Sequence, residues 1–283
     1  MRTTLESACL VLTFALSCAG CGDNKTPYPT RERYVTDAAA LLGCTPNLDG
    51  RIDASELGPA LGIPVSYLVS PAGQERTVDV SGIDDGRGGR IWDFSVDLAS
   101  DQVASLSANE LAGKWYASSF PGGQFTVAID AGGTIEGVYV QDATSLRLLG
   151  VASRDEGPAE GQTLLVYDSP VTIFAFPIEP GATWVSAGSV SGGMFRGLPY
   201  AGRDTYETHV DAMGVAELPS FRFTQVHRVR TRVTVEPAVG ASTSRRQVSL
   251  VFECFGEVAR VTSRPDEPQE DFTTAAEVRR LGS

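Results

Sequence analysis

Oxygen-bearing side chains alternate along residues 45–56, which read TPNLDGRIDASE. Ligands at such alternate positions can wrap a hard cation, and a final glutamate can bind it through both oxygens. Gly50 in the middle permits the sharp bend that this geometry requires. The pattern predicts a calcium site, and we expect no other cofactor. Its predicted ligands are Asn47, Asp49, Arg51 through its backbone carbonyl, Asp53 and Glu56.

The same twelve residues resemble the EF-hand calcium loop, with Gly50 at the sixth position and Glu56 at the twelfth. The resemblance implies an entering helix, and the apolar pattern over residues 32–42 agrees with one. Two features depart from the family. Thr45 replaces the usual first Asp, and the Gly-Pro pair at 58–59 cuts the exit helix short. The alternative is a capped turn that keeps this shape without metal.

The first 21 residues, MRTTLESACLVLTFALSCAGC, have the layout of a secretion signal. Arg2 gives a positive start, and the apolar run over residues 8–17 is too short to span a bilayer. The closing CAGC resembles the bacterial lipobox, which implies acylation of Cys21. Gly22 after it implies the outer membrane. Acylation of Cys18 and an ordinary signal peptide are the alternatives.

Two cysteines remain after the signal is removed and Cys21 is acylated. An even number in an oxidising compartment predicts a disulfide between Cys44 and Cys254. In the loop-entropy model, a bridge across so long a loop stabilises the fold by roughly 4–5 kcal/mol. The alternative is two separate buried thiols.

A row of arginines marks the segment 221–235, in which apolar and basic residues alternate. Arginine binds phosphate and carboxylate groups through two parallel hydrogen bonds, so the row predicts an anion-binding face. The alternative is a solvated face whose arginines pair with acidic residues on neighbouring strands. The arginines concerned are Arg222, Arg228, Arg230 and Arg232.

The elements that position these residues are mainly strands. From residue 64 onward, short stretches of period-two alternation are separated by Gly and Pro clusters, without a βαβ alternation. This pattern predicts a mainly β fold with a curved antiparallel sheet, as a sandwich or a partly open barrel, and a short helical N-terminal neck. Residues 97–111 are the one internal segment predicted as a helix.

These patterns divide the chain into four parts. We expect a lipoprotein signal peptide at 1–20, a flexible tether at 21–33, a helical EF-hand-like neck at 34–62 and an antiparallel β body at 63–283.

Composition excludes several classes of function. The net charge of −12 argues against a nucleic-acid partner, and 42% hydrophobic residues argue against disorder. The sequence has two histidines, lacks the G-x-S-x-G, Walker and H-E-x-x-H motifs, and has C-x-x-C spacing only in the CAGC of the predicted signal. We therefore expect a non-catalytic protein.

Three segments resemble an uncharacterised family of bacterial lipoproteins from GC-rich, myxobacteria-like genomes. Residues 176–184 (FPIEPGATW) are similar to its PLxxGxxW signature, residues 217–223 (ELPSFRF) to VPAGxF, and residues 252–258 (FECFGEV) to WYAxGVGxV. The resemblance implies a curved sheet in the periplasm or at the cell surface, without a known reaction.

Residues 113–116 (GKWY) also resemble the lipocalin GxWY opening, which implies a barrel that holds an apolar ligand.

Together these features predict a lipid-anchored protein of the bacterial envelope that acts by binding or as a structural module. Its expected partners are the membrane, reached through the lipid, and a protein or envelope component. One alternative is a carrier of an apolar or lipid ligand within the curved sheet. Another is a glycan-active hydrolase that uses two of the 35 acidic residues.

Overall fold

The computed structural model describes residues 43–130 and 132–282. The predicted signal peptide, the tether with Cys21 and residues 34–42 of the neck lie outside the described residues. The compact unit that carries the fold begins at Cys44.

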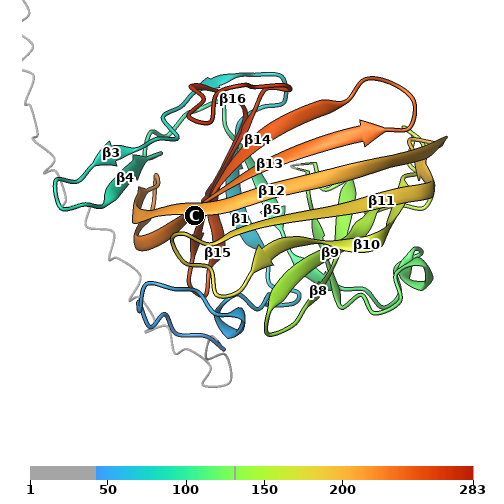
Figure 1. The fold of residues 1–283 in the computed structure, drawn as a ribbon, viewed down its shortest axis with the longest axis horizontal. Coiled ribbons are helices and arrows are strands. Elements are labelled where there is room, and N and C mark those ends of the chain that lie inside the picture. Colours follow the sequence, from blue (N-terminus) through green and yellow to red (C-terminus); the bar gives the residue numbers. More distant parts are fainter. Residues whose placement is uncertain (1–42, 131, 283) are drawn as a thin grey trace, which may run out of the picture. The chain divides into compact units, whose positions relative to one another are not determined.

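Sixteen strands and two short 3-10 turns make up the regular structure of the described residues (Figure 1). The turns are η1 (Ala54–Glu56) and η2 (Ala117–Ser119). The strands are β1 (Val65–Val69), β2 (Arg76–Thr77), β3 (Ile83–Asp84), β4 (Arg90–Asp93), β5 (Gln102–Leu106), β6 (Ala108–Glu110), β7 (Phe125–Ala128), β8 (Ile135–Gln141), β9 (Ser145–Ser153), β10 (Leu164–Ala175), β11 (Thr183–Phe195), β12 (Leu198–Glu217), β13 (Arg222–Pro237), β14 (Thr243–Phe252), β15 (Gly256–Ser263) and β16 (Thr274–Leu281).

Thirteen of these strands form one antiparallel path in the order β5-β1-β16-β15-β14-β13-β12-β11-β10-β9-β8-β7-β6. The two edge strands, β5 and β6, are separated in the sequence by Ser107 alone. β5 pairs with β1 and β6 pairs with β7, so one continuous segment joins the two ends of the path. The sheet is therefore nearly closed into a barrel, which confirms the mainly β prediction.

The helix predicted over residues 97–111 is wrong, because β5 and β6 occupy this segment. Unpaired N–H and C=O groups at two sheet edges are costly, and an extended segment satisfies both edges at once. A helix would pair its backbone groups within itself and leave both sheet edges unpaired. The described part of the predicted helical neck, residues 43–62, contains the single turn η1.

The near-barrel has two faces with different surroundings. Strands far apart in the sheet order bring Tyr67 (β1), Tyr139 (β8) and Arg260 (β15) close enough for their charges to interact, so these side chains mark the inner face. The outer face of β13 to β16 is covered by β4 and by the segment before β16, with Trp92 and Phe272 fully buried between the layers.

Candidate functional site

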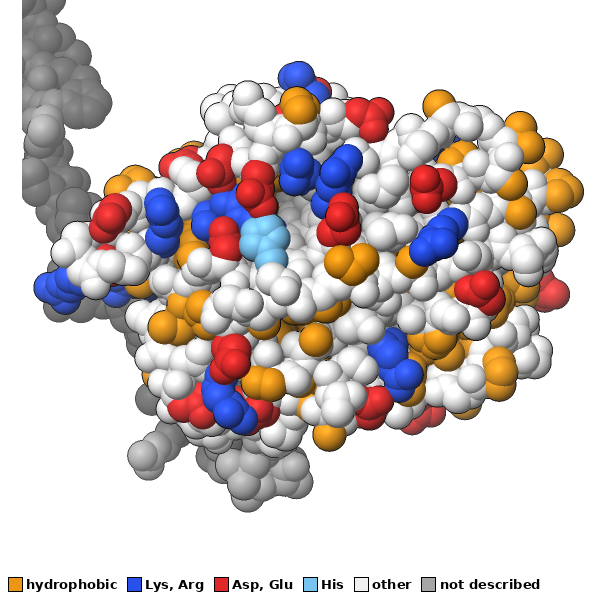
Figure 2. All heavy atoms as spheres, viewed as in Figure 1, with side chains coloured by type: hydrophobic (Ala, Val, Ile, Leu, Met, Phe, Trp, Pro, Cys, Tyr) orange, Lys and Arg blue, Asp and Glu red, His pale blue; other side chains and the backbone are white. Residues whose placement is uncertain are grey.

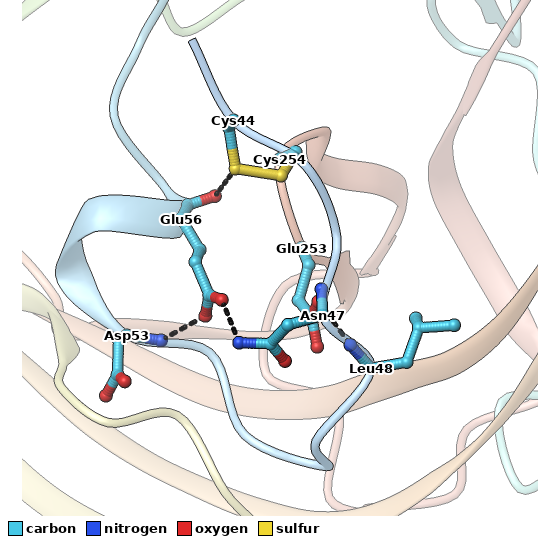
Figure 3. Close-up of a disulfide and its surroundings, with 7 residues drawn as sticks. All are labelled: Cys44, Asn47, Leu48, Asp53, Glu56, Glu253 and Cys254. Carbon is cyan, nitrogen blue, oxygen red and sulfur yellow. Dashed lines mark hydrogen bonds between the residues drawn. A yellow bond between two sulfur atoms is a disulfide. The ribbon is translucent and has the colours of Figure 1, made fainter. Parts of the chain in front are cut away.

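The disulfide predicted from cysteine counting is present (Figure 3). Cys44 and Cys254 are joined with their Cα atoms 5.5 Å apart. Cys254 lies in the tight turn between β14 and β15, where its φ is +65°. The bridge therefore fastens the start of the compact unit to a hairpin turn 210 residues later.

The segment after Cys44 is held against the barrel at several further points. The backbone N–H groups of Asn47 and Leu48 donate to one carboxylate oxygen of buried Glu253, at 2.7 and 2.9 Å (Figure 3). Ile52 exchanges backbone hydrogen bonds of 3.0 and 2.9 Å with Ile178, and both side chains are fully buried. The loop is thus a fixed part of the body.

The predicted calcium ligands lie within one loop, but their oxygens already accept hydrogen bonds. Asn47 Oδ1 accepts from the Asp49 N–H at 2.8 Å, and Asp49 Oδ1 accepts from the Arg51 N–H at 3.1 Å. The two Glu56 carboxylate oxygens accept from Asn47 Nδ2 and from the Asp53 N–H, at 2.6 and 2.9 Å (Figure 3).

The guanidinium of Arg51 also pairs with Asp53 at 2.7 Å. Over residues 43–130 and 132–282, no group of three or more His, Cys, Asp or Glu side chains is arranged to hold a metal ion. The hydrogen bonds of this loop therefore match the capped turn of the alternative interpretation, and calcium binding stays a prediction.

The arginines of β13 do not share one face. A bulge at Gln225, whose φ is +59°, adds one residue to β13 opposite β12. Because the bulge shifts the alternation by one position, Phe223 and Val226 share the outer face. Arg222 consequently lies on the opposite face from Arg228, contrary to the prediction. It pairs with Glu217 at 2.6 Å.

Arg228 and Arg230 are buried under the segments that cover the outer face. Both bond to Asp211, at 2.7 and 2.8 Å, and Arg230 also pairs with Asp271 at 2.5 Å. Burial opposes ionisation of Asp211, but the two guanidinium groups outweigh it and lower its pKa. These two arginines thus pair with acidic residues, as the alternative interpretation predicts, but they are buried and do not lie on a solvated face.

Arg232 differs from its neighbours because it is half-exposed and loosely paired. Its nearest carboxylate, Glu207, lies 4.0 Å away. Directly opposite Arg232 in the β13–β14 register stands Arg246. The guanidinium of Arg246 donates to the backbone carbonyls of Glu267 and Pro268, at 3.0 and 3.1 Å, and forms no ion pair within the described part of the chain.

These two arginines line a groove of about 650 Å³ on the outer face of β11 to β14. Figure 2 shows this face hollowed, with basic, acidic and histidine side chains around the hollow. His209 pairs with Glu270 at 3.0 Å on one side of it. Thr183 and Val185 of β11 also line the groove, as the register partners of His209 and Glu207.

Arg246 and His209 were not among the residues predicted for a site. The sequence signal for Arg246 is the alternation of Val248, Leu250 and Phe252, because Arg246 stands at the next even position before them. Pairing that strand with 221–235 through the Pro- and Gly-containing turn would have placed two arginines opposite each other. His209 had no such signal, since its partner Glu270 lies 61 positions away in a loop.

Comparison with known proteins gives no match: no family model fits the chain, and no curated protein or solved structure is similar to it. The resemblances to the lipoprotein family and to lipocalins therefore stay predictions. Within the described residues, no helix is both long and apolar enough to cross a membrane.

Proposed function

We propose that the protein is a non-catalytic binding module of the bacterial envelope, anchored by a lipid on Cys21. Its binding site is the groove of β11 to β14, and its ligand is a polymer that carries carboxylate or phosphate groups. The observation that supports this proposal is the Arg232–Arg246 pair, two like charges directly opposite each other in a sheet.

Like charges at directly opposed positions destabilise a sheet unless something lies between them. Arg228 and Arg230 have such a compensating group in Asp211. Arg232 and Arg246 share none, although the chain carries twelve more acidic than basic residues. An anionic group bound between the two guanidinium groups would accept charge-assisted hydrogen bonds from both.

The rest of the groove favours a polar ligand over an apolar one. Thr183, Glu207, His209 and Glu270 supply hydroxyl, carboxylate and imidazole groups along it. Hydrogen bonds to such groups reward ligand hydroxyls and reject analogues that lack them. The ligand class with both hydroxyl and acidic groups is an acidic or phosphorylated polysaccharide of the envelope.

Calorimetric titration of the full chain with an oligogalacturonate, and separately with a phosphorylated oligosaccharide, tests this proposal. We expect at least one to bind, and the double variant Arg232→Gln/Arg246→Gln to bind it about 10-fold or more weakly, because two charged hydrogen-bond donors are lost. Arg147→Gln is the matched control, since Arg147 is a surface arginine already paired with Asp142 at 2.8 Å. Equal weakening by the control, or no binding of either ligand, would refute the groove as the site.

A further inference from the structure

The inner face of the near-barrel carries an unusual share of polar aromatic and charged side chains. Five of the six tyrosines in the described residues, all except Tyr116, belong to it. They are Tyr67, Tyr139, Tyr167, Tyr200 and Tyr206. Two arginines and two glutamates of β15 and β16 lie among them, namely Glu257, Arg260, Glu277 and Arg279. The interior of a small barrel is usually filled by apolar side chains, and the inner face of this sheet differs in its charged and hydroxyl groups.

Arg260 and Arg279 face each other in the β15–β16 register, so a second like-charge pair stands on the inner face. Arg279 is 3% exposed, and its contacts to the Ile129 carbonyl and to Glu277 are both long, at 3.3 Å. The Nε atom of Arg279 is buried without a hydrogen-bond partner, whereas Nε of Arg260 lies 3.1 Å from a carboxylate oxygen of Glu257. Burial, followed by the charge of Arg260, lowers the pKa of Arg279.

The neighbouring carboxylates compensate these charges incompletely. Glu257 lies 3.1 Å from Arg260, but its other oxygen accepts a hydrogen bond from Ser249 Oγ at 2.6 Å. Glu277 is one-third exposed and touches Arg279 at 3.3 Å. A buried guanidinium nitrogen without an acceptor, such as Arg279 Nε, is costly, and a bound anion would satisfy it.

Tyr139 lies beside this arginine pair, on β8 across the barrel. Its ring stacks on Phe125 with centroids 5.6 Å apart, and the charges of Arg260, Glu257 and Arg279 all act on its hydroxyl. Burial is the main cause that raises the pKa of Tyr139 to about 12, so the hydroxyl is a neutral donor. It makes no hydrogen bond to any of the described residues, and the side chain is partly exposed.

Aromatic and apolar inner-face side chains near Tyr139 are also partly exposed. Tyr206 contacts the cluster of Leu148 and Tyr167, and Val233 is its register partner on β13. Tyr206, Val233 and Val235 are all partly exposed although they face inward. A ligand that reaches the arginine pair would therefore also contact apolar and aromatic surface.

We infer that the inner face binds a monocarboxylate with an apolar tail, such as a medium-chain fatty acid. The carboxylate accepts hydrogen bonds from Arg260, Arg279 and the Tyr139 hydroxyl, and the tail lies along the partly exposed apolar side chains of β12 and β13. This site is separate from the groove and does not depend on the function proposed for it.

Titration of the full chain with decanoate and with decanol tests the inference, because the two ligands share a tail and differ in charge. We expect decanoate to bind about tenfold or more tightly than decanol, through its charge-assisted hydrogen bonds. Arg260→Met removes one charge and should abolish that preference. Tyr139→Phe keeps the ring and the Phe125 stack, so it reports on the hydroxyl in a fold that is preserved, and it should weaken decanoate binding severalfold.

The groove variant Arg232→Gln/Arg246→Gln is the matched control and should bind decanoate like the wild type. Loss of decanoate binding in that variant would place the carboxylate in the groove and overturn the inference. Equal affinity for decanoate and decanol, no binding of decanoate, or an unchanged affinity in Tyr139→Phe would overturn it as well.

Discussion

At the scale of single residues, the partly exposed acid Asp211 links the buried arginines of β13 to the stability of the fold. It pairs with both Arg228 and Arg230, at 2.7 and 2.8 Å, while keeping about a quarter of its own side chain exposed. Its pKa is lowered in the folded protein relative to an unfolded chain. Because its pKa is lowered, ionised Asp211 contributes fully to folding stability above its pKa in the unfolded chain, near pH 4. This contribution is lost as the pH falls through its pKa in the folded protein.

The variant Asp211→Asn should therefore destabilise the protein strongly at pH 7 and much less at acidic pH. Removing one partner of a buried pair costs about 3–5 kcal/mol, and the partial exposure of Asp211 places the expected loss at or below the lower end. Urea unfolding of wild type and variant at pH 7 and pH 3 measures this. A loss in unfolding free energy that is the same at both pH values would contradict the account.

Residue identity alone did not reveal which arginines are structural. Arg228 and Arg232 are both at even positions of one alternating stretch, so sequence periodicity treats them alike. What separates them is the covering segment: Arg228 donates to the carbonyls of Val80 and Ser81, some 147 residues away, whereas Arg232 is half-exposed. Long-range covering of this kind leaves no local trace in the sequence.

At the scale of elements, the parallel pairing of β4 with β12 is the contact that covers the outer face. A Cβ atom added at Gly214 would lie 2.0 Å from the Arg90 carbonyl oxygen, because the backbones of β4 and β12 approach closely there. Trp92 follows on β4 and is fully buried against the sheet.

Gly214→Ala should consequently displace β4 and expose Trp92. We expect a loss of at least about 2 kcal/mol in unfolding free energy, since backbone atoms must move and core contacts open, together with a red shift in tryptophan emission. Gly192→Ala on β11 is the matched control, because no atom lies within 4 Å of its added Cβ. Similar behaviour of the two variants would show that the close approach at Gly214 does not matter.

Strands were easier to predict than their faces or the way the sheet closes. Period-two alternation predicted most strands of the sheet, and the Cys44–Cys254 bridge followed from counting cysteines. The bulge at Gln225 was not predictable, because a non-glycine residue at φ +59° carries no local signal. The local pattern of 97–111 predicts a helix, whereas β5 and β6 form by pairing with β1 and β7, and no local pattern in the sequence reports those pairings.

At the scale of the whole molecule, the proposed anchor places an acidic body beside a membrane. Cys21 lies 23 positions before Cys44, so the connecting chain can extend up to roughly 75–80 Å.

Metabolic labelling with a radioactive or clickable fatty acid tests the anchor in a diderm bacterial host. We expect the wild type to be labelled and Cys21→Ala to lose the label and the membrane-fraction signal. Cys9→Ala, which changes a cysteine within the predicted signal, is the control and should label normally. Undiminished labelling of Cys21→Ala would exclude this cysteine as the acceptor.

The central claim is that Arg232 and Arg246 form an anion site, and charge reversal at Arg232 tests it most directly. Arg232→Glu places a carboxylate opposite Arg246 in the β13–β14 register. Opposite charges at this position stabilise the sheet, and the new carboxylate occupies the position of the anionic group of the ligand. Calorimetric titration of this variant with the acidic oligosaccharide that the wild type binds is the decisive measurement. We expect no detectable binding at concentrations that saturate the wild type, and binding with wild-type affinity would refute the anion site.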